Sequence, residues 1–120
     1  MPAYSPNRIV VISLWAEDVP ETAHFYKDVL GLELLSHHHG DRPHFKVGDT
    51  YLTILKGKPI PPENSIPERF PLFALGVDDL DAAVERLQTH GVELPWGVEE
   101  GQGTRWVMFH DPAGNLIEIT

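Results

Sequence analysis

Residues 12–34 read ISLWAEDVPETAHFYKDVLGLEL, and the order of residue types in this segment predicts a strand, a helix and a second strand. The β-branched run at residues 9–14 predicts a strand, and the acidic pair Glu17-Asp18 after it predicts the start of a helix. Acidic residues favour that position because their oxygens cap free N–H groups and their charge meets the positive end of the helix dipole. Gly31 predicts the end of the helix, since glycine readily adopts the left-handed conformation that closes a helix.

The same pattern occurs a second time further along the chain. Residues 72–77 predict a strand, the run DDLD at residues 78–81 predicts a helix start, and Gly91 predicts the end of that helix. Gly91 lies 60 residues after Gly31. This spacing indicates an internal repeat, so the chain is expected to contain two modules of the same shape.

Three short strands are predicted after each helix, separated by turn residues. They are expected at residues 33–36, 44–47 and 50–55 in the first half, and at residues 92–94, 105–109 and 116–120 in the second. Module one (about residues 7–58) and module two (residues 72–120) are joined by a connector at residues 59–71 that contains five prolines. The predicted fold is α+β, a single domain over residues 1–120 whose two βαβββ modules form facing curved mixed sheets around a central cleft.

The composition limits the classes of protein and partner. The chain has 120 residues, 42% hydrophobic and 22% charged, as expected of one compact folded domain. It contains no cysteine, which excludes disulfides and thiolate metal ligands. The net charge is −9 without a cluster of basic residues, which argues against nucleic acid and anionic membranes as partners. No secretory signal or membrane span is recognised, so a cytoplasmic location is expected.

Three motifs in the expected order carry a resemblance to a known family. The first is the stretch quoted above, with Phe-Tyr at residues 25–26 and Leu-Gly at residues 30–31. The second is the helix at residues 77–91, and the third is FHDPAGNLIEI at residues 109–119. Together they resemble the vicinal oxygen chelate superfamily of glyoxalase, bleomycin-resistance and dioxygenase proteins. The resemblance implies paired βαβββ modules around a cleft, often in a homodimer, in which the modules pair within one chain or between chains.

The resemblance also assigns the positions of a metal site. Enzymes of the family hold a divalent metal in the cleft, where it chelates vicinal oxygens of the substrate, whereas other members bind toxic drugs without metal. The family's ligand positions correspond to Val11, Thr53, Leu72 and Glu118 in this chain. Only Glu118 offers an anionic donor, and a zinc-like site needs about three protein ligands. The usual metal site is therefore predicted to be absent, and no metal cofactor is expected.

Histidines offer a second, weaker metal hypothesis. His37 and His39 follow a predicted strand, and His44 begins the next one, so these three could chelate a metal. Glu118 is the remaining candidate ligand. The alternative interpretation is a solvated polar turn.

Strand alternation predicts which side chains would contact a ligand. If Glu118 faces the cleft, then Ile117 and Ile119 pack against a helix, and the same reasoning buries Val107 and Phe109. The predicted pocket is apolar with aromatic walls, which suits a small, partly aromatic organic molecule. The predicted ligand-binding residues are Val11, Ser13, Trp15, Tyr51, Thr53, Leu72, Ala74, Trp106, Met108, His110 and Glu118.

Several functions remain open at this level. The first is a metal-free protein that binds a small molecule, like the bleomycin-resistance branch. The second is an enzyme of lyase, isomerase or dioxygenase type that uses a rearranged metal site or an acid–base pair of Glu118 and His110. The third is a structural domain whose cleft is filled by its own side chains. A carboxylate in a dry pocket needs a partner, for which His110 and Arg105 are the candidates.

Overall fold

The structure is a computed structural model that describes residues 4, 6–35, 42–59 and 70–120. Module one contains five regular elements and the π-helical turn η1, which continues α1. Its elements are β1 (Val11–Ala16), α1 (Val19–His24), η1 (Phe25–Val29), β2 (Glu33–Leu34), β3 (His44–Val47) and β4 (Thr50–Lys56). Module two repeats the order with β5 (Ala74–Leu75), α2 (Leu80–Thr89), β6 (Glu99–Gly101), β7 (Thr104–His110) and β8 (Leu116–Ile119).

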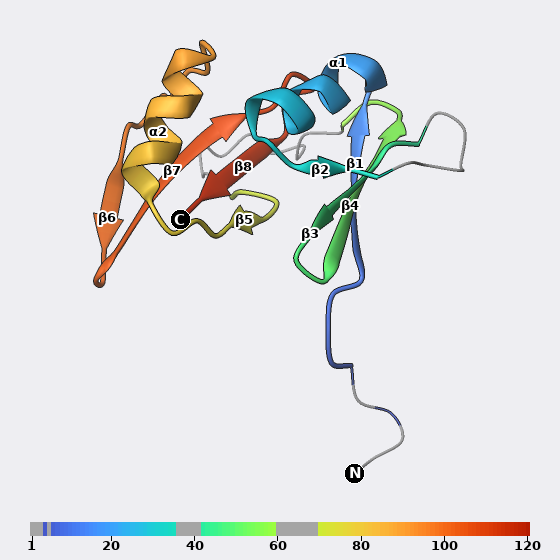
Figure 1. The fold of residues 1–120 in the computed structure, drawn as a ribbon, viewed down its shortest axis with the longest axis horizontal. Helices are drawn as coiled ribbons and strands as arrows, with labels where there is room; N and C mark the ends of the chain where they lie inside the picture. Colours follow the sequence, from blue (N-terminus) through green and yellow to red (C-terminus); the bar gives the residue numbers. More distant parts are fainter. Residues whose placement is uncertain (1–3, 5, 36–41, 60–69) are drawn as a thin grey trace.

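Each module forms one four-stranded mixed sheet (Figure 1). The strand order is β1-β4-β3-β2 in sheet 1 and β5-β8-β7-β6 in sheet 2, so the two sheets have the same topology. β1 runs parallel to β4 and β5 runs parallel to β8, while the other neighbours are antiparallel. This arrangement confirms the predicted α+β fold of two βαβββ modules. Within the described residues, no helix is long and apolar enough to span a membrane.

Both helices begin and end where the sequence predicts. The Oδ1 atom of Asp18 accepts a hydrogen bond from the Glu21 N–H at 3.0 Å, which caps the start of α1. Asp79 caps α2 in the same way. Gly31 and Gly91 have φ angles of 78° and 76°, the left-handed conformation that was expected after each helix.

One predicted strand is wrong. Residues 92–94 have no strand structure, and the strand at that place in the module is instead β6, at Glu99–Gly101. The Val92 N–H donates to the Leu87 carbonyl at 2.9 Å, so the backbone just after α2 is used to close that helix. β6 pairs with β7 through a two-residue turn whose residues have φ angles of 50° and 80°, the signs that a tight hairpin requires.

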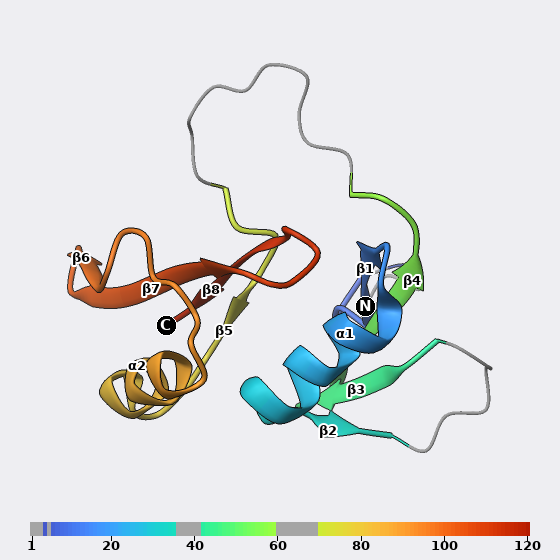
Figure 2. The same cartoon turned by 90° about the horizontal axis from the view of Figure 1, so that it is seen from above.

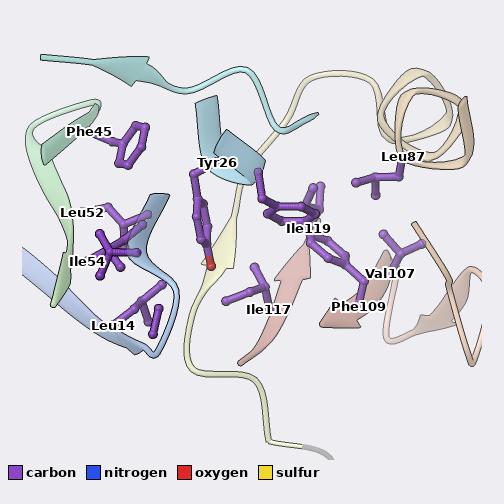
Figure 3. Close-up of a cluster of buried hydrophobic side chains, with 13 residues drawn as sticks. Leu14, Tyr26, Phe45, Leu52, Ile54, Leu87, Val107, Phe109, Ile117 and Ile119 are labelled. Carbon is purple, nitrogen blue, oxygen red and sulfur yellow. The ribbon is translucent and has the colours of Figure 1, made fainter. Parts of the chain in front are cut away.

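One hydrophobic core contains residues of both modules (Figure 3). The fully buried ring of Tyr26 lies 6.1 Å from the ring of Phe45 in sheet 1. Its neighbour Phe25 lies 6.1 Å from the ring of Phe109 in sheet 2. Val107, Phe109, Ile117 and Ile119 of sheet 2 are buried in this core, as the alternation predicts. The two sheets of one chain therefore meet through their helix-bearing faces (Figure 2), and their other faces, called the open faces below, point outward.

A buried carboxylate joins the two modules. Asp111, which is 4% exposed, accepts a hydrogen bond from the Tyr26 hydroxyl at 2.8 Å. It also accepts hydrogen bonds from the backbone N–H groups of Ala113 and Asn115 and from the Asn115 side chain. The Asn115 amide donates a further bond to the backbone carbonyl of Trp15 at 3.1 Å. This network connects η1 and the end of β1 to the turn between β7 and β8.

Arg86 makes a second polar connection between the modules. Its Nε atom donates to the Val29 carbonyl at 2.7 Å, and its Nη2 atom donates to the Asp28 carbonyl at 3.1 Å. These carbonyls lie at the C-terminal end of η1, where unpaired carbonyls and the helix dipole favour a cation. The guanidinium also lies over Gly31, where an added Cβ would meet the Nη2 atom at 3.4 Å.

The burial of Tyr26 predicts a loss of stability at alkaline pH. Burial raises the pKa of the Tyr26 phenol far above its usual range, and the charge and hydrogen bond of Asp111 raise it further. The folded state therefore retains a proton that the unfolded state releases above about pH 10. The stabilisation is complete below that pH, and above it the unfolding free energy is expected to fall by about 1.4 kcal/mol per pH unit.

Urea unfolding between pH 8 and pH 11 would measure this contribution. The Tyr26→Phe variant should lose that part of the pH dependence, because it has no phenol to ionise. Tyr4 is 85% exposed, so Tyr4→Phe is the matched control and should retain the wild-type slope. Identical slopes for wild type and Tyr26→Phe would contradict the expected linkage.

Candidate functional site

The open face of sheet 1 carries the side chains that alternation predicts. Val11 and Trp15 are 47% and 50% exposed, whereas the intervening Leu14 is 2% exposed and packs in the core. The register places Val11 beside Tyr51 on β4, and the next pair on the same face is Ser13 and Thr53. This face therefore combines aromatic and aliphatic surface with a few hydroxyl groups.

The open face of sheet 2 carries the other predicted residues. Glu118 lies between Ala74 on β5 and Met108 on β7. Trp106 and His110 lie on the same face as Met108, because they alternate with buried residues along β7. Met108 is only 9% exposed, although it lies on this face.

An apolar groove runs between module one and β5, beside the open faces. Its volume is about 530 Å³. Three of the predicted ligand-binding residues line it: Tyr51, Leu72 and Ala74. Ile9, in the segment before β1, lines it as well. Its apolar walls suit an organic ligand or another apolar surface.

The four positions that the resemblance assigns to metal ligands provide few donor atoms. Val11 and Leu72 have hydrocarbon side chains without a donor atom. Thr53 is 5% exposed, and its hydroxyl donates to the Pro43 carbonyl at 3.0 Å. Glu118 alone provides an anionic oxygen. The described part of the chain contains no group of three His, Cys, Asp or Glu side chains that could hold a metal ion.

Of the three histidines in the second metal hypothesis, the structure describes one. His37 and His39 lie outside the described residues. His44 is half-buried at the start of β3, and its Nδ1 atom lies 2.9 Å from the Arg42 carbonyl. It pairs with Thr53 on β4, so its side chain is on the open face of sheet 1.

Glu118 and His110 lie on one face but not in direct contact. His110 is opposite Leu116, and Glu118 is opposite Met108, so the two are diagonal neighbours across β7 and β8. Such neighbours are about 7–8 Å apart, enough to place a ligand atom between them. The other proposed partner of Glu118 is wrong: Arg105 forms an ion pair with Asp81 at 2.6 Å.

Two features of this face were missed at the level of sequence. The ring of Trp96, in the segment between α2 and β6, lies 6.2 Å from the ring of His110. Strand alternation does not predict the position of Trp96, because this residue lies in an irregular segment. The Nε1 atom of Trp106 is buried and has no hydrogen-bond acceptor among the described residues. An unpaired buried donor costs about 1–3 kcal/mol, so an acceptor from a ligand or a second chain would be favoured there.

The chain is similar to known proteins over nearly its whole length. It is 34% identical over 117 aligned positions to the uncharacterized protein YaeR of Escherichia coli (strain K12), with 90% of this chain and 91% of that protein covered. The structure is similar to that of lactoylglutathione lyase from Agrobacterium tumefaciens, with a TM-score of 0.75, 25% identity and coverage of 97% and 94% of the two chains.

A second solved structure is TnmS3, an antibiotic binding protein from Streptomyces sp. CB03234. The TM-score is 0.73 at 28% identity, with coverage of 98% and 97% of the two chains. A family model described as Glyoxalase/Bleomycin resistance protein/Dioxygenase superfamily matches residues 8–119. The match of this family model and the repeated βαβββ module show that the chain belongs to the glyoxalase/bleomycin resistance protein/dioxygenase superfamily.

Proposed function

We propose that this protein binds a small, partly aromatic organic molecule without the metal of its enzymatic relatives, and that it acts in the cytoplasm. The observation that carries the proposal is the chemistry of the four expected ligand positions. Two are hydrocarbon side chains, and the hydroxyl of the third is buried and bonded to a backbone carbonyl. One carboxylate is too few for a catalytic zinc-like site, which usually has three protein ligands.

Exposed aromatic side chains support an organic ligand. Trp15, Tyr51 and Trp96 are 50%, 38% and 38% exposed, although water solvates such large apolar surfaces poorly. Glu118 adds a sparse polar group to otherwise apolar walls. Binding sites for small molecules commonly combine these two features. The antibiotic-binding relative of similar fold is consistent with this use of the scaffold.

We further propose that the protein is a homodimer whose second copy packs against the free edges of β1 and β5. The free strand edges and the large apolar side chains that one chain leaves exposed support this proposal.

The exposed apolar residues locate this surface. Within the described part of the chain, β1 pairs only with β4 and β5 only with β8, so both strands have a free edge. The segment before β1 extends away from the sheet (Figure 1). Large exposed apolar side chains lie in this segment (Ile9, Val10), on β1 and β4 (Val11, Tyr51) and before β5 (Phe70, Leu72). Free edges and apolar patches of this kind favour association.

Metal content and ligand binding test the proposed function together. Untagged protein, purified without nickel, should contain far less than one metal per chain by elemental mass spectrometry. Calorimetric titration with a panel of small aromatic compounds should find binding that Glu118→Gln weakens, because the carboxylate faces the site. Glu85→Gln is the matched control, since Glu85 is exposed on α2, away from both open faces.

Two results would overturn the proposal. Near-stoichiometric metal that is lost in Glu118→Gln would indicate a metal enzyme. Turnover that is abolished in both Glu118→Gln and His110→Ala would indicate the acid–base alternative. Metal lost only in the His37→Ala/His39→Ala variant would instead identify an incidental site and leave the proposal standing.

A further inference from the structure

Gly57 lies directly after β4, and the ring of Trp15 rests on its backbone. A Cβ atom at this position would lie 2.4 Å from Cε3, 2.9 Å from Cζ3 and 3.2 Å from Cδ2 of the indole. Non-bonded carbon atoms favour separations of about 3.5–4.0 Å. The three atoms belong to the six-membered part of the indole, so this position admits no side chain while the ring stays in place.

The contact with Trp15 explains the glycine at this position, and the backbone conformation does not. Gly57 does not have the left-handed φ angle that marks Gly31, Gly48 and four other glycines of the chain. Gly76 also lacks it, but a Cβ there would meet nothing within 4 Å. Gly76 therefore has room for a side chain, whereas Gly57 does not.

The structure holds Trp15 in place and still leaves half of it in water. Its carbonyl accepts a hydrogen bond from the Asn115 amide, and the Gly57 N–H donates to the carbonyl of Ala16 at 3.0 Å. One ring face is covered by the backbone of Gly57, yet the residue is 50% exposed. An aromatic plate that is already ordered loses little conformational entropy when a ligand binds.

We propose that Gly57 is a positioning residue that holds the Trp15 ring flat, so that its outer face stacks on a planar aromatic ring of the ligand. This inference rests on the proposed function and narrows the class of ligand. A positive charge on that ring is favoured, because the π-face attracts cations and the chain carries a net charge of −9. An alanine at position 57 would push the indole outward and tilt the plate that the ligand needs.

Calorimetric titration with two amines of equal charge tests the inference. Proflavine is a planar aromatic cation, whereas adamantan-1-ammonium is a bulky cation without a flat ring. Wild-type protein should bind proflavine at least tenfold more tightly than the adamantane amine. Gly57→Ala should weaken proflavine binding about tenfold or more, while the matched control Gly76→Ala should stay within twofold of wild type.

A double-mutant cycle separates the positioning role from a general defect. Trp15→Ala should weaken proflavine binding by a similar factor, and adding Gly57→Ala to it should have no further effect, since no ring remains to be displaced. In a Trp96→Phe/Trp106→Phe background, the tryptophan fluorescence comes from Trp15 alone. Gly57→Ala should increase the quenching of this fluorescence by acrylamide, because the indole is pushed outward. Thermal unfolding of each variant would show whether it remains folded.

Failure of this inference can be distinguished from failure of the proposed function. A panel compound that binds while proflavine does not, or proflavine binding that Trp15→Ala leaves unchanged, would overturn the inference and leave the proposed function standing. Equal losses from Gly57→Ala with and without Trp15 would also overturn it. Absence of binding by every compound of the panel would overturn both.

Discussion

Replacing Asp111 with alanine is expected to lower the unfolding free energy by about 3–5 kcal/mol. The carboxylate accepts hydrogen bonds from the Tyr26 hydroxyl, from the Asn115 side chain and from two backbone N–H groups, and it is 4% exposed. Removing it leaves the Tyr26 hydroxyl and the two backbone N–H groups without this acceptor, and each buried donor left unpaired costs about 1–3 kcal/mol. It also separates η1 from the turn between β7 and β8, so both modules are affected.

Urea denaturation of three variants would measure this effect. Asp111→Asn keeps the volume and one acceptor oxygen, so it should cost about 1–3 kcal/mol, less than the alanine variant. Asp78→Ala is the matched control, since Asp78 is exposed, and it should stay within about 0.5 kcal/mol of wild type. A loss below about 1 kcal/mol for Asp111→Ala would show that the network does not stabilise the packing of the modules.

A glutamate at Leu72 is expected to convert a dimer into monomers. Leu72 is 59% exposed two residues before β5 and lines the apolar groove together with Ile9 and Tyr51. If a second copy covers this surface, the glutamate would bury an unpaired charge in an apolar contact. The dimer should weaken at least about 100-fold, which corresponds to about 2.7 kcal/mol.

Sedimentation over a range of concentrations would measure the change. Wild-type protein should sediment at twice the 13.5 kDa of one chain, and Leu72→Glu at the mass of one chain. Val77→Glu is the matched control, because Val77 is 40% exposed but lines a hollow beside α2 rather than the apolar groove. A monomeric wild type would contradict the proposed dimer. Equal weakening by both variants would contradict the location of its interface.

Local patterns predicted most of the secondary structure. Asp18 and Asp79 cap the two helices, and Gly31 and Gly91 close them, because capping depends on residues within one helical turn. Period-two alternation also assigned strand faces correctly, as the burial of Ile117 shows. The strand at residues 99–101 was missed because its assignment depends on its pairing with β7, which the local sequence does not show.

The site itself was only partly predictable. Alternation placed Val11 and Trp15 on an open face, and the resemblance identified the hydrocarbon side chains at two ligand positions. Neither of them indicated Trp96, whose ring approaches His110 from an irregular segment. Of the two partners suggested for Glu118, Arg105 was wrong, because it forms an ion pair with Asp81 on a different element.

The amino-acid sequence alone predicted the two modules, their helix ends and the faces of their strands, because these features depend on neighbours a few positions away. It could not show that both modules share a core, or that their open faces point outward. Those properties depend on contacts between distant residues, such as Tyr26 with Asp111, 85 positions apart, and Gly57 with Trp15. Such contacts arise only when the modules pack, because no local periodicity records which distant side chain will fill a given space.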